Sequence, residues 1–395
     1  MKKTNPFLRL VTILVAVGVA CSTLNSGSVE STKSSTPSPT QASIPTLAPI
    51  NTIMPLATST PNGPPPLTMD NYKQFGALYT WKVSPDIGRV NGIAISQTAE
   101  RVVLITQRAK EVYGLELHDL EGNMVWEKTL EAKAAWPAIA FSPDGTKIAV
   151  GLENGKVQLW DTEAATFIDM TGKHSYPVRI IVFSPHGKYL ASGASDNQVH
   201  LWNLETQVQT PTCFYWDPSN KSKCRPDNKT DVRDLAFSPN GDYLAVSANV
   251  VVLLDTSTGL EADRYWDFAG DTKDLAEVAF SPDGQTLASS GNWFNTGNQK
   301  YRKRILLWDY PGGSQNPVKV PLDDALEDLV FSPDGKVIIG SYKNKGLLML
   351  FDREARNPIG TIDLGPSLLM SYSFDLRMFA VLSTRISVSI WGVLQ

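Results

Sequence analysis

The sequence predicts an all-β fold made of seven repeated units, and two observations support this prediction. First, a short pattern recurs seven times: one hydrophobic run closes in Phe-Ser-Pro-Asp-Gly or a relative, and the next closes in Leu-Trp-Asp or a relative. Second, only strand-like runs lie between these motifs, and no segment after residue 70 keeps a helical period over three turns. A strand-only period of about forty residues is typical of a closed repeat fold.

Two anchor residues locate each unit. The first anchors are Ile95, Phe141, Phe183, Phe237, Phe280, Phe331 and Tyr372. The second anchors are His118, Trp160, Trp202, Leu254, Trp308, Phe351 and Trp391. The spacing is steady except for two insertions, one between Trp202 and Phe237 and one between Phe280 and Trp308. The first and last units depart most from the pattern, as terminal repeats often do.

Each unit is expected to contain four strands. In the second unit we expect strands over 137–141, 147–151, 156–161 and 167–170. Ser142-Pro143-Asp144-Gly145 separates the first two strands, and Glu153-Asn154-Gly155 separates the next two. Asp-Gly and Asn-Gly are strong hairpin signals because both favour positive φ.

On these motifs, residues 71–395 resemble a WD40-repeat protein. The resemblance implies an all-β, seven-bladed β-propeller of four-stranded antiparallel blades, best seen at Leu159-Trp160-Asp161 and Leu307-Trp308-Asp309. The Pro-Asp-Gly turn is also similar to that of six-bladed TolB-type propellers. The steady recurrence of Leu-Trp-Asp favours seven blades over six.

The first and last strands of the domain are expected to close the ring together. The seventh unit runs out at its third strand, 391–395, so its blade lacks one strand. Residues 77–82, ahead of the first repeat, have the right pattern to fill the vacant place. Closure by an N-terminal strand removes an exposed sheet edge, so it should stabilise the domain strongly.

The resemblance also implies a hydrogen-bonded structural network within the third blade, formed by His174, Ser192, Asp196 and Trp202. The same residue types could suggest a nucleophilic triad. The structural interpretation is preferred, because the family uses the hydroxyl to hold strands together. No catalytic residue is therefore assigned.

The first twenty residues have the pattern of an export signal. Lys2 and Lys3 precede a short apolar core, Val11 to Val19, which is too short for a stable membrane-spanning helix. Gly18-Val19-Ala20-Cys21 resembles the lipobox of bacterial lipoproteins, which implies lipidation of Cys21 and an extracytoplasmic domain anchored to a bacterial membrane. An ordinary cleaved signal is the alternative. Membrane contact is expected only through the lipid.

Residues 21–70 are expected to be a disordered linker. Ser, Thr and Pro dominate from Ser22 to Thr68, charged residues are few, and aromatic residues are absent from that stretch. Such a segment cannot bury enough apolar area to offset the entropy of ordering it.

Composition and motif content argue against several functions. The net charge of −4 gives no basic field for nucleic acid. The four histidines include no i, i+4 pair and no Cys/His zinc spacing, and no Asp-rich calcium loop occurs. We therefore expect neither a metal nor a cofactor.

Cys213 and Cys224 both lie in the first insertion, with ten residues between them. Because the chain is expected to be exported, a disulfide is the favoured state. Closing so short a loop would contribute about 2–3 kcal/mol. Two unpaired thiols are the alternative.

The two insertions are rich in aromatic and cationic residues, and the resemblance places them on one face of the ring, in blades four and five. This composition is typical of a recognition patch. Mutual packing of the rings is the alternative. The proposed patch consists of Tyr215, Trp216, Lys223, Arg225, Trp293, Phe294, Tyr301 and Arg302.

Together these features predict a surface-tethered, non-enzymatic module for protein–protein interaction. The alternative is an extracytoplasmic propeller enzyme or ligand binder that uses the central channel. Its candidates, chosen only by their place at the starts of inner strands, are Asn91, Arg179, Arg233 and Glu327. A passive assembly scaffold is a third possibility.

Overall fold

The computed structural model describes most of the chain after residue 64. The described residues are 65–84, 86–96, 98, 100–109, 112–134, 138–212, 231–248, 250–265, 271–295, 300–312, 317–342, 345–354, 356–365, 369–373, 377–383 and 387–393. At 109, 271–276, 292–295 and 300–302 the backbone is described without the side chains. The predicted signal peptide, Cys21 and nearly all of the predicted linker lie outside these residues.

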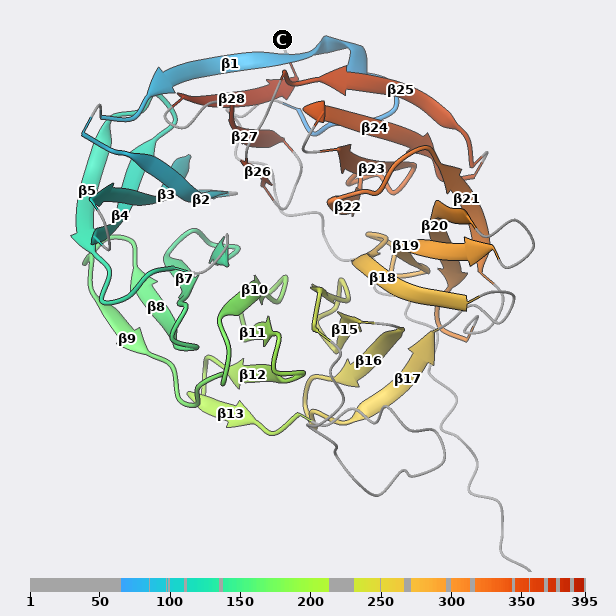
Figure 1. Ribbon diagram of the computed structural model, residues 1–395, viewed down its shortest axis with the longest axis horizontal. Helices are drawn as coiled ribbons and strands as arrows, with labels where there is room; N and C mark the ends of the chain where they lie inside the picture. Colours follow the sequence, from blue (N-terminus) through green and yellow to red (C-terminus); the bar gives the residue numbers. More distant parts are fainter. Residues whose placement is uncertain are drawn as a thin grey trace, which may run out of the picture. The chain divides into compact units, whose positions relative to one another are not determined.

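The predicted fold class is confirmed: seven four-stranded antiparallel sheets form a propeller (Figure 1). Blade one contains β2 (Arg89–Ile95), β3 (Arg101–Ala109), β4 (Val112–Asp119) and β5 (Met124–Thr129). Blade two contains β6 (Ile139–Phe141), β7 (Lys147–Gly151), β8 (Val157–Asp161) and β9 (Phe167–Asp169). Blade three contains β10 (Val178–Phe183), β11 (Tyr189–Ala194), β12 (Val199–Asn203) and β13 (Val208–Thr210).

The next three blades repeat this arrangement. Blade four contains β14 (Asp234–Phe237), β15 (Tyr243–Ser247), β16 (Val251–Asp255) and β17 (Glu261–Tyr265). Blade five contains β18 (Asp271–Phe280), β19 (Thr286–Asn295), β20 (Lys300–Asp309) and β21 (Val318–Leu322). Blade six contains β22 (Asp328–Phe331), β23 (Val337–Tyr342), β24 (Leu347–Asp352) and β25 (Pro358–Asp363). Among the described residues no helix combines the length and the apolar character that crossing a membrane would require.

Blade seven is built from both ends of the domain, as predicted. It contains β26 (Leu369–Tyr372), β27 (Met378–Leu382) and β28 (Ser387–Val393), and β1 (Phe75–Lys82) is its outermost strand. β1 pairs antiparallel with β28 from Phe75↔Val393 to Lys82↔Ser387. The ring therefore has no unpaired edge between its first and last units.

The residues just before β1 fasten the chain to blade six as well. Leu67 is fully buried in a cluster with side chains of blades six and seven. The Tyr72 hydroxyl, in the short helix η1 (Tyr72–Gln74), donates a hydrogen bond of 3.1 Å to the Ile359 carbonyl of β25. A Cβ on Gly360 would approach the Tyr72 ring to 2.7 Å, so this glycine makes room for the aromatic side chain.

The Phe-Ser-Pro-Asp-Gly motif forms the turn between the first two strands of a blade. In blade two the Ser142 hydroxyl donates to the Asp144 carboxylate at 2.5 Å and accepts from the Lys147 amide at 2.9 Å. Gly145 has a φ of 72°, which a residue with a side chain rarely adopts. The same serine–aspartate bond recurs at Ser281 and Ser332, so the motif is a turn device.

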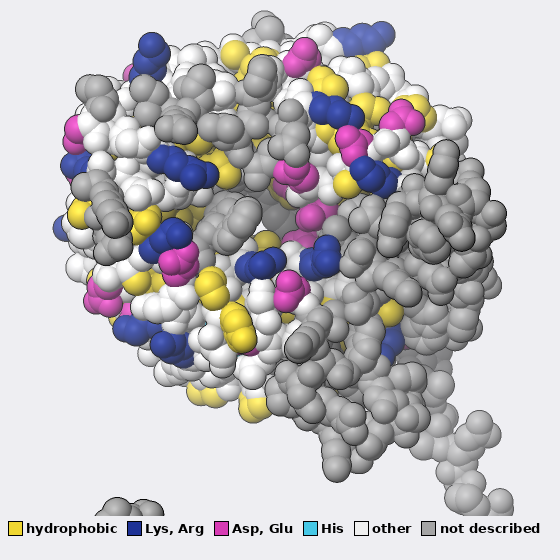
Figure 2. Space-filling model, viewed as in Figure 1, with side chains coloured by type: hydrophobic (Ala, Val, Ile, Leu, Met, Phe, Trp, Pro, Cys, Tyr) yellow, Lys and Arg dark blue, Asp and Glu magenta, His cyan; other side chains and the backbone are white. Residues whose placement is uncertain are grey.

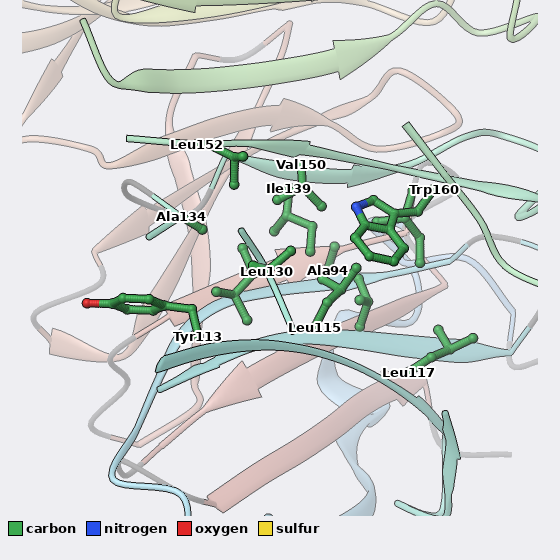
Figure 3. Packing of buried hydrophobic residues seen from close by; sticks show 13 residues of the cluster. Ala94, Tyr113, Leu115, Leu117, Leu130, Ala134, Ile139, Val150, Leu152 and Trp160 are labelled. Atoms are coloured by element: carbon green, nitrogen blue, oxygen red, sulfur yellow. The ribbon is translucent and has the colours of Figure 1, made fainter. Parts of the chain in front are cut away.

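The hydrophobic core lies between neighbouring blades. Figure 3 shows the cluster between blades one and two, where Leu115 of β4 and Val150 of β7 are fully buried. The second-anchor residue Trp160 joins this cluster with 2% of its surface exposed. Fully burying one large apolar side chain contributes roughly 1.5–3 kcal/mol, so the repeated anchors bind each blade to its neighbour.

Candidate functional site

Three of the four predicted network residues in blade three are joined by hydrogen bonds. His174 Nδ1 lies 3.1 Å from both carboxylate oxygens of Asp196, and its Nε2 lies 2.8 Å from the Ser192 hydroxyl. Trp202 is fully buried in the same blade, but its indole N–H donates to the Thr171 carbonyl at 2.7 Å. Trp202 therefore ties the same β9–β10 connection that carries His174, but through a backbone carbonyl.

The surroundings of the network keep Asp196 ionised. Burial alone would raise the pKa of this carboxyl, but hydrogen bonds from His174 and from the amides of Ser175 and Gln198 outweigh it, so the pKa is lowered. His200 stacks on His174 with 4.0 Å between ring centroids. Burial and the neighbouring His174 lower the pKa of His200 to about 4, which leaves it neutral near pH 7. This geometry is a structural tie with a fully buried serine.

The network also shows which connections share a face of the ring. His174 lies between β9 and β10, and Asp196 lies between β11 and β12, yet their side chains touch. The connection into a blade and the connection between its second and third strands therefore lie on one side. We call the side that carries His174, Asp196 and Asp231 the network face.

Both described ends of the first insertion lie near this face. The Thr212 hydroxyl donates to the carbonyl of Val199, the first residue of β12. At the other end, Asp231 forms an ion pair of 3.7 Å with Arg179 at the start of β10. The predicted disulfide partners and the patch residues of this insertion lie outside the described residues: Cys213, Cys224, Tyr215, Trp216, Lys223 and Arg225.

The second insertion is paired strand rather than the loop expected from the sequence. Registers Trp293↔Arg302 and Phe294↔Tyr301 continue the β19–β20 ladder out to Asn295↔Lys300. β18 extends alongside, with Asp271 opposite Phe294. The first three strands of blade five each span ten residues, whereas β6 spans three. Trp293, Phe294, Tyr301 and Arg302 therefore stand on a three-stranded extension, in which the β18–β19 register shifts twice.

Charged side chains gather around a central hollow of the ring in Figure 2. Of the channel candidates, Asn91 and Arg179 lie at register shifts in β2 and β10, where the ladder with the next strand is interrupted. Arg179, Arg233 and Glu327 are exposed, and Asn91 is half-buried. Within the described residues no group of three or more His, Cys, Asp and Glu side chains is placed to hold a metal ion.

A buried polar cluster in blade one was missed by sequence reasoning. Glu116 is fully buried, accepts from the Thr106 hydroxyl at 3.0 Å and contacts His118 Nε2 at 3.1 Å. Arg108 adds an ion pair of 3.3 Å. Burial alone would raise the pKa of Glu116, but these hydrogen bonds lower it. A polar residue two positions before the second anchor is the signal, and it recurs at Gln158 and His200.

Comparisons with known proteins agree with this architecture. Residues 166–203 and 212–249 match the family model described as WD domain, G-beta repeat, and residues 93–176 match the model described as Anaphase-promoting complex subunit 4 WD40 domain. A comparison with curated proteins finds no match. The matched segments run from blade one into blade four. These segments are therefore similar to WD40 repeats, in agreement with the seven blades, and WD40 propellers are commonly protein-interaction modules.

Proposed function

We propose that this chain is a lipid-anchored, extracytoplasmic recognition module without enzymatic activity, which binds a protein partner on the network face over blades four and five. The observation that carries the proposal is the extension of β18, β19 and β20 beyond the length of the other inner strands. The proposed contact residues Trp293, Phe294, Tyr301 and Arg302 all lie on this extension.

Backbone pairing suits the extension to binding. Three strands hold one another by ladder hydrogen bonds, so the patch loses little conformational entropy when a partner docks. Aromatic residues and arginine are enriched among residues that dominate the energetics of protein interfaces. The first insertion returns to the ring at Asp231, beside the start of blade four, and would contribute Trp216 and Arg225 to the same surface.

The N-terminal sequence supports the anchoring part of the proposal. Lys2 and Lys3, the short apolar core and Cys21 would place a lipid at the start of the linker. Metabolic labelling with an alkyne fatty acid tests this directly. The native chain should carry the label and Cys21→Ser should lose it, and equal labelling of both chains would contradict the anchor.

Partner capture tests the binding surface. A crosslinked pull-down from the native envelope identifies the partner, which is then purified and titrated against the full chain. Trp216→Ala combined with Trp293→Ala should weaken that binding by tenfold or more without lowering the melting temperature, since hot-spot residues contribute about 2 kcal/mol or more each.

Tyr79→Ala provides a matched control. Tyr79 is an aromatic residue on β1 of blade seven with 41% of its surface exposed, and it is not part of the proposed patch. Binding should be unchanged in this variant. A large loss of thermal stability in the tryptophan variant, with partner affinity retained, would show instead that the aromatic residues pack on each other.

A further inference from the structure

Blades four and five are joined by two carboxyl groups. Asp234 is the first residue of β14, and its Oδ2 accepts a hydrogen bond of 2.9 Å from the Val278 amide of β18. The carboxyl groups of Asp234 and Glu277 also lie close enough to interact, since each changes the pKa of the other. A carboxylate only accepts hydrogen bonds, so two carboxyl groups can bond to each other only if one of them carries a proton. We call Asp234 and Glu277 the carboxyl joint.

The groups packed around the joint are mainly acidic or neutral. Asp328 of β22 accepts from the Leu329 amide at 2.9 Å and from the Tyr372 hydroxyl of β26 at 3.0 Å. Ser247 of β15 lies opposite Asp234 in register. The Ser290 hydroxyl of β19 accepts from the Glu277 amide at 3.2 Å.

Three further charged residues stand near the joint in sequence or act on it. Glu327, just before β22, is exposed, and its negative charge acts on Glu277. Arg233, the residue before Asp234, is also exposed. Arg179 of β10 is paired with Asp231.

The surroundings favour the protonated form. Although each residue as a whole is only partly buried, close packing around the carboxyl groups is the main cause that raises the pKa of Asp234 to about 7, and Asp328 raises it further. Burial, followed by Asp234, Asp328 and Glu327, also raises the pKa of Glu277.

We propose that the interface between blades four and five is a proton-dependent joint, closed by one proton shared between Asp234 and Glu277 and loosened when that proton leaves. With the proton gone, two carboxylates would face each other beside Asp328. These two like charges would repel each other, so the Asp234–Glu277 contact would be lost while the Val278 amide keeps Asp234 as its acceptor.

The direction of the pH effect follows from linkage. A carboxyl group whose pKa is raised on folding binds its proton more tightly in the folded state. Its contribution to stability is therefore present below about pH 4 and is lost as pH rises through about pH 7. β14 follows the first insertion and β18 belongs to the extension, so the joint lies beneath the proposed binding surface. Partner binding should therefore depend on pH as well, and this part of the inference rests on the proposed function.

Thermal unfolding of the purified full-length chain between pH 5 and pH 8 tests the joint without any partner. The native chain should lose about 5 °C or more over this range. In Glu277→Gln the amide can donate to Asp234 at every pH, so the profile should flatten and the variant should melt higher than the native chain at pH 8. Asp234→Asn should flatten it as well, which preserves the test if one variant fails to fold.

Glu327→Gln is the matched control, since it removes a neighbouring negative charge but leaves the shared proton in place. It should keep a pH dependence close to that of the native chain. A flat native profile, or the same flattening in Glu327→Gln as in Glu277→Gln, would overturn the proposal. A pH-dependent melting profile with no partner binding would instead count against the proposed function alone.

Discussion

Blades three and five are stabilised at the network face in different ways. In blade three, His174, Ser192 and Asp196 tie two connections of one blade together through buried side chains. In blade five, ten-residue strands pair out to Asn295↔Lys300, and the carboxyl joint links the blade to its neighbour. Hydrogen bonds between side chains can hold a short connection against its blade. Backbone pairing between long strands lets a connection extend away from the ring and present side chains to a partner.

The largest expected effect breaks the tie in blade three. His174→Ala leaves Asp196 and Ser192 buried without their shared partner, which should destabilise the domain by about 3 kcal/mol. Urea denaturation measures this loss. His186→Ala, at an exposed turn in the same blade, should change the unfolding free energy by less than about 0.5 kcal/mol. Equal effects of the two substitutions would show that the tie contributes nothing.

A smaller effect compares the second-anchor tryptophans of the two blades. Trp202 donates to the Thr171 carbonyl, whereas the Trp308 indole nitrogen has no hydrogen-bond partner within the described part of the chain. Both rings are almost completely buried. Trp202→Phe should therefore cost about 1 kcal/mol more than Trp308→Phe in the same denaturation assay. A larger loss at Trp308 would contradict this assignment.

A third prediction contrasts the sign of the pH dependence at the two sites. Asp196 has a lowered pKa, so its contribution to stability is present above its unfolded pKa and is lost as pH falls through its folded pKa. The carboxyl joint behaves in the opposite way. Asp196→Asn should therefore flatten the acid side of the stability profile, and Asp234→Asn the neutral side. Melting temperatures at pH 3 to 8 check both, and identical profiles would remove the contrast.

Much of the ring was predictable because its signals are local. The turn motif depends on a serine, an aspartate and a glycine within four residues, and the full set recurs in units two, five and six. The missing strand of the seventh blade followed from counting strands, so β1 was expected over 77–82 and is observed over Phe75–Lys82.

The parts that were missed depend on contacts between distant residues. The segment treated as an insertion rich in aromatic and cationic residues in blade five is strand, because β19 and β20 pair as far as Asn295↔Lys300. The carboxyl joint was missed although Asp234, Glu277 and Asp328 each stand three residues before a first anchor. That recurrence in three successive units was a usable signal, but the contact between Asp234 and Glu277 forms only after the blades assemble.

Pairing of β1 with β28 has a consequence for the order of folding. On a ribosome, β1 is made early but its partner, β28, is roughly three hundred residues further along, so β1 has to wait unpaired while six blades are synthesised. Bringing together strands so far apart in the chain is slow, because loop closure costs entropy before any contact offsets it. Until blades six and seven are made, Leu67 and Phe75 lack the hydrophobic side chains that later pack around them, so both stay open to chaperones and to other nascent chains.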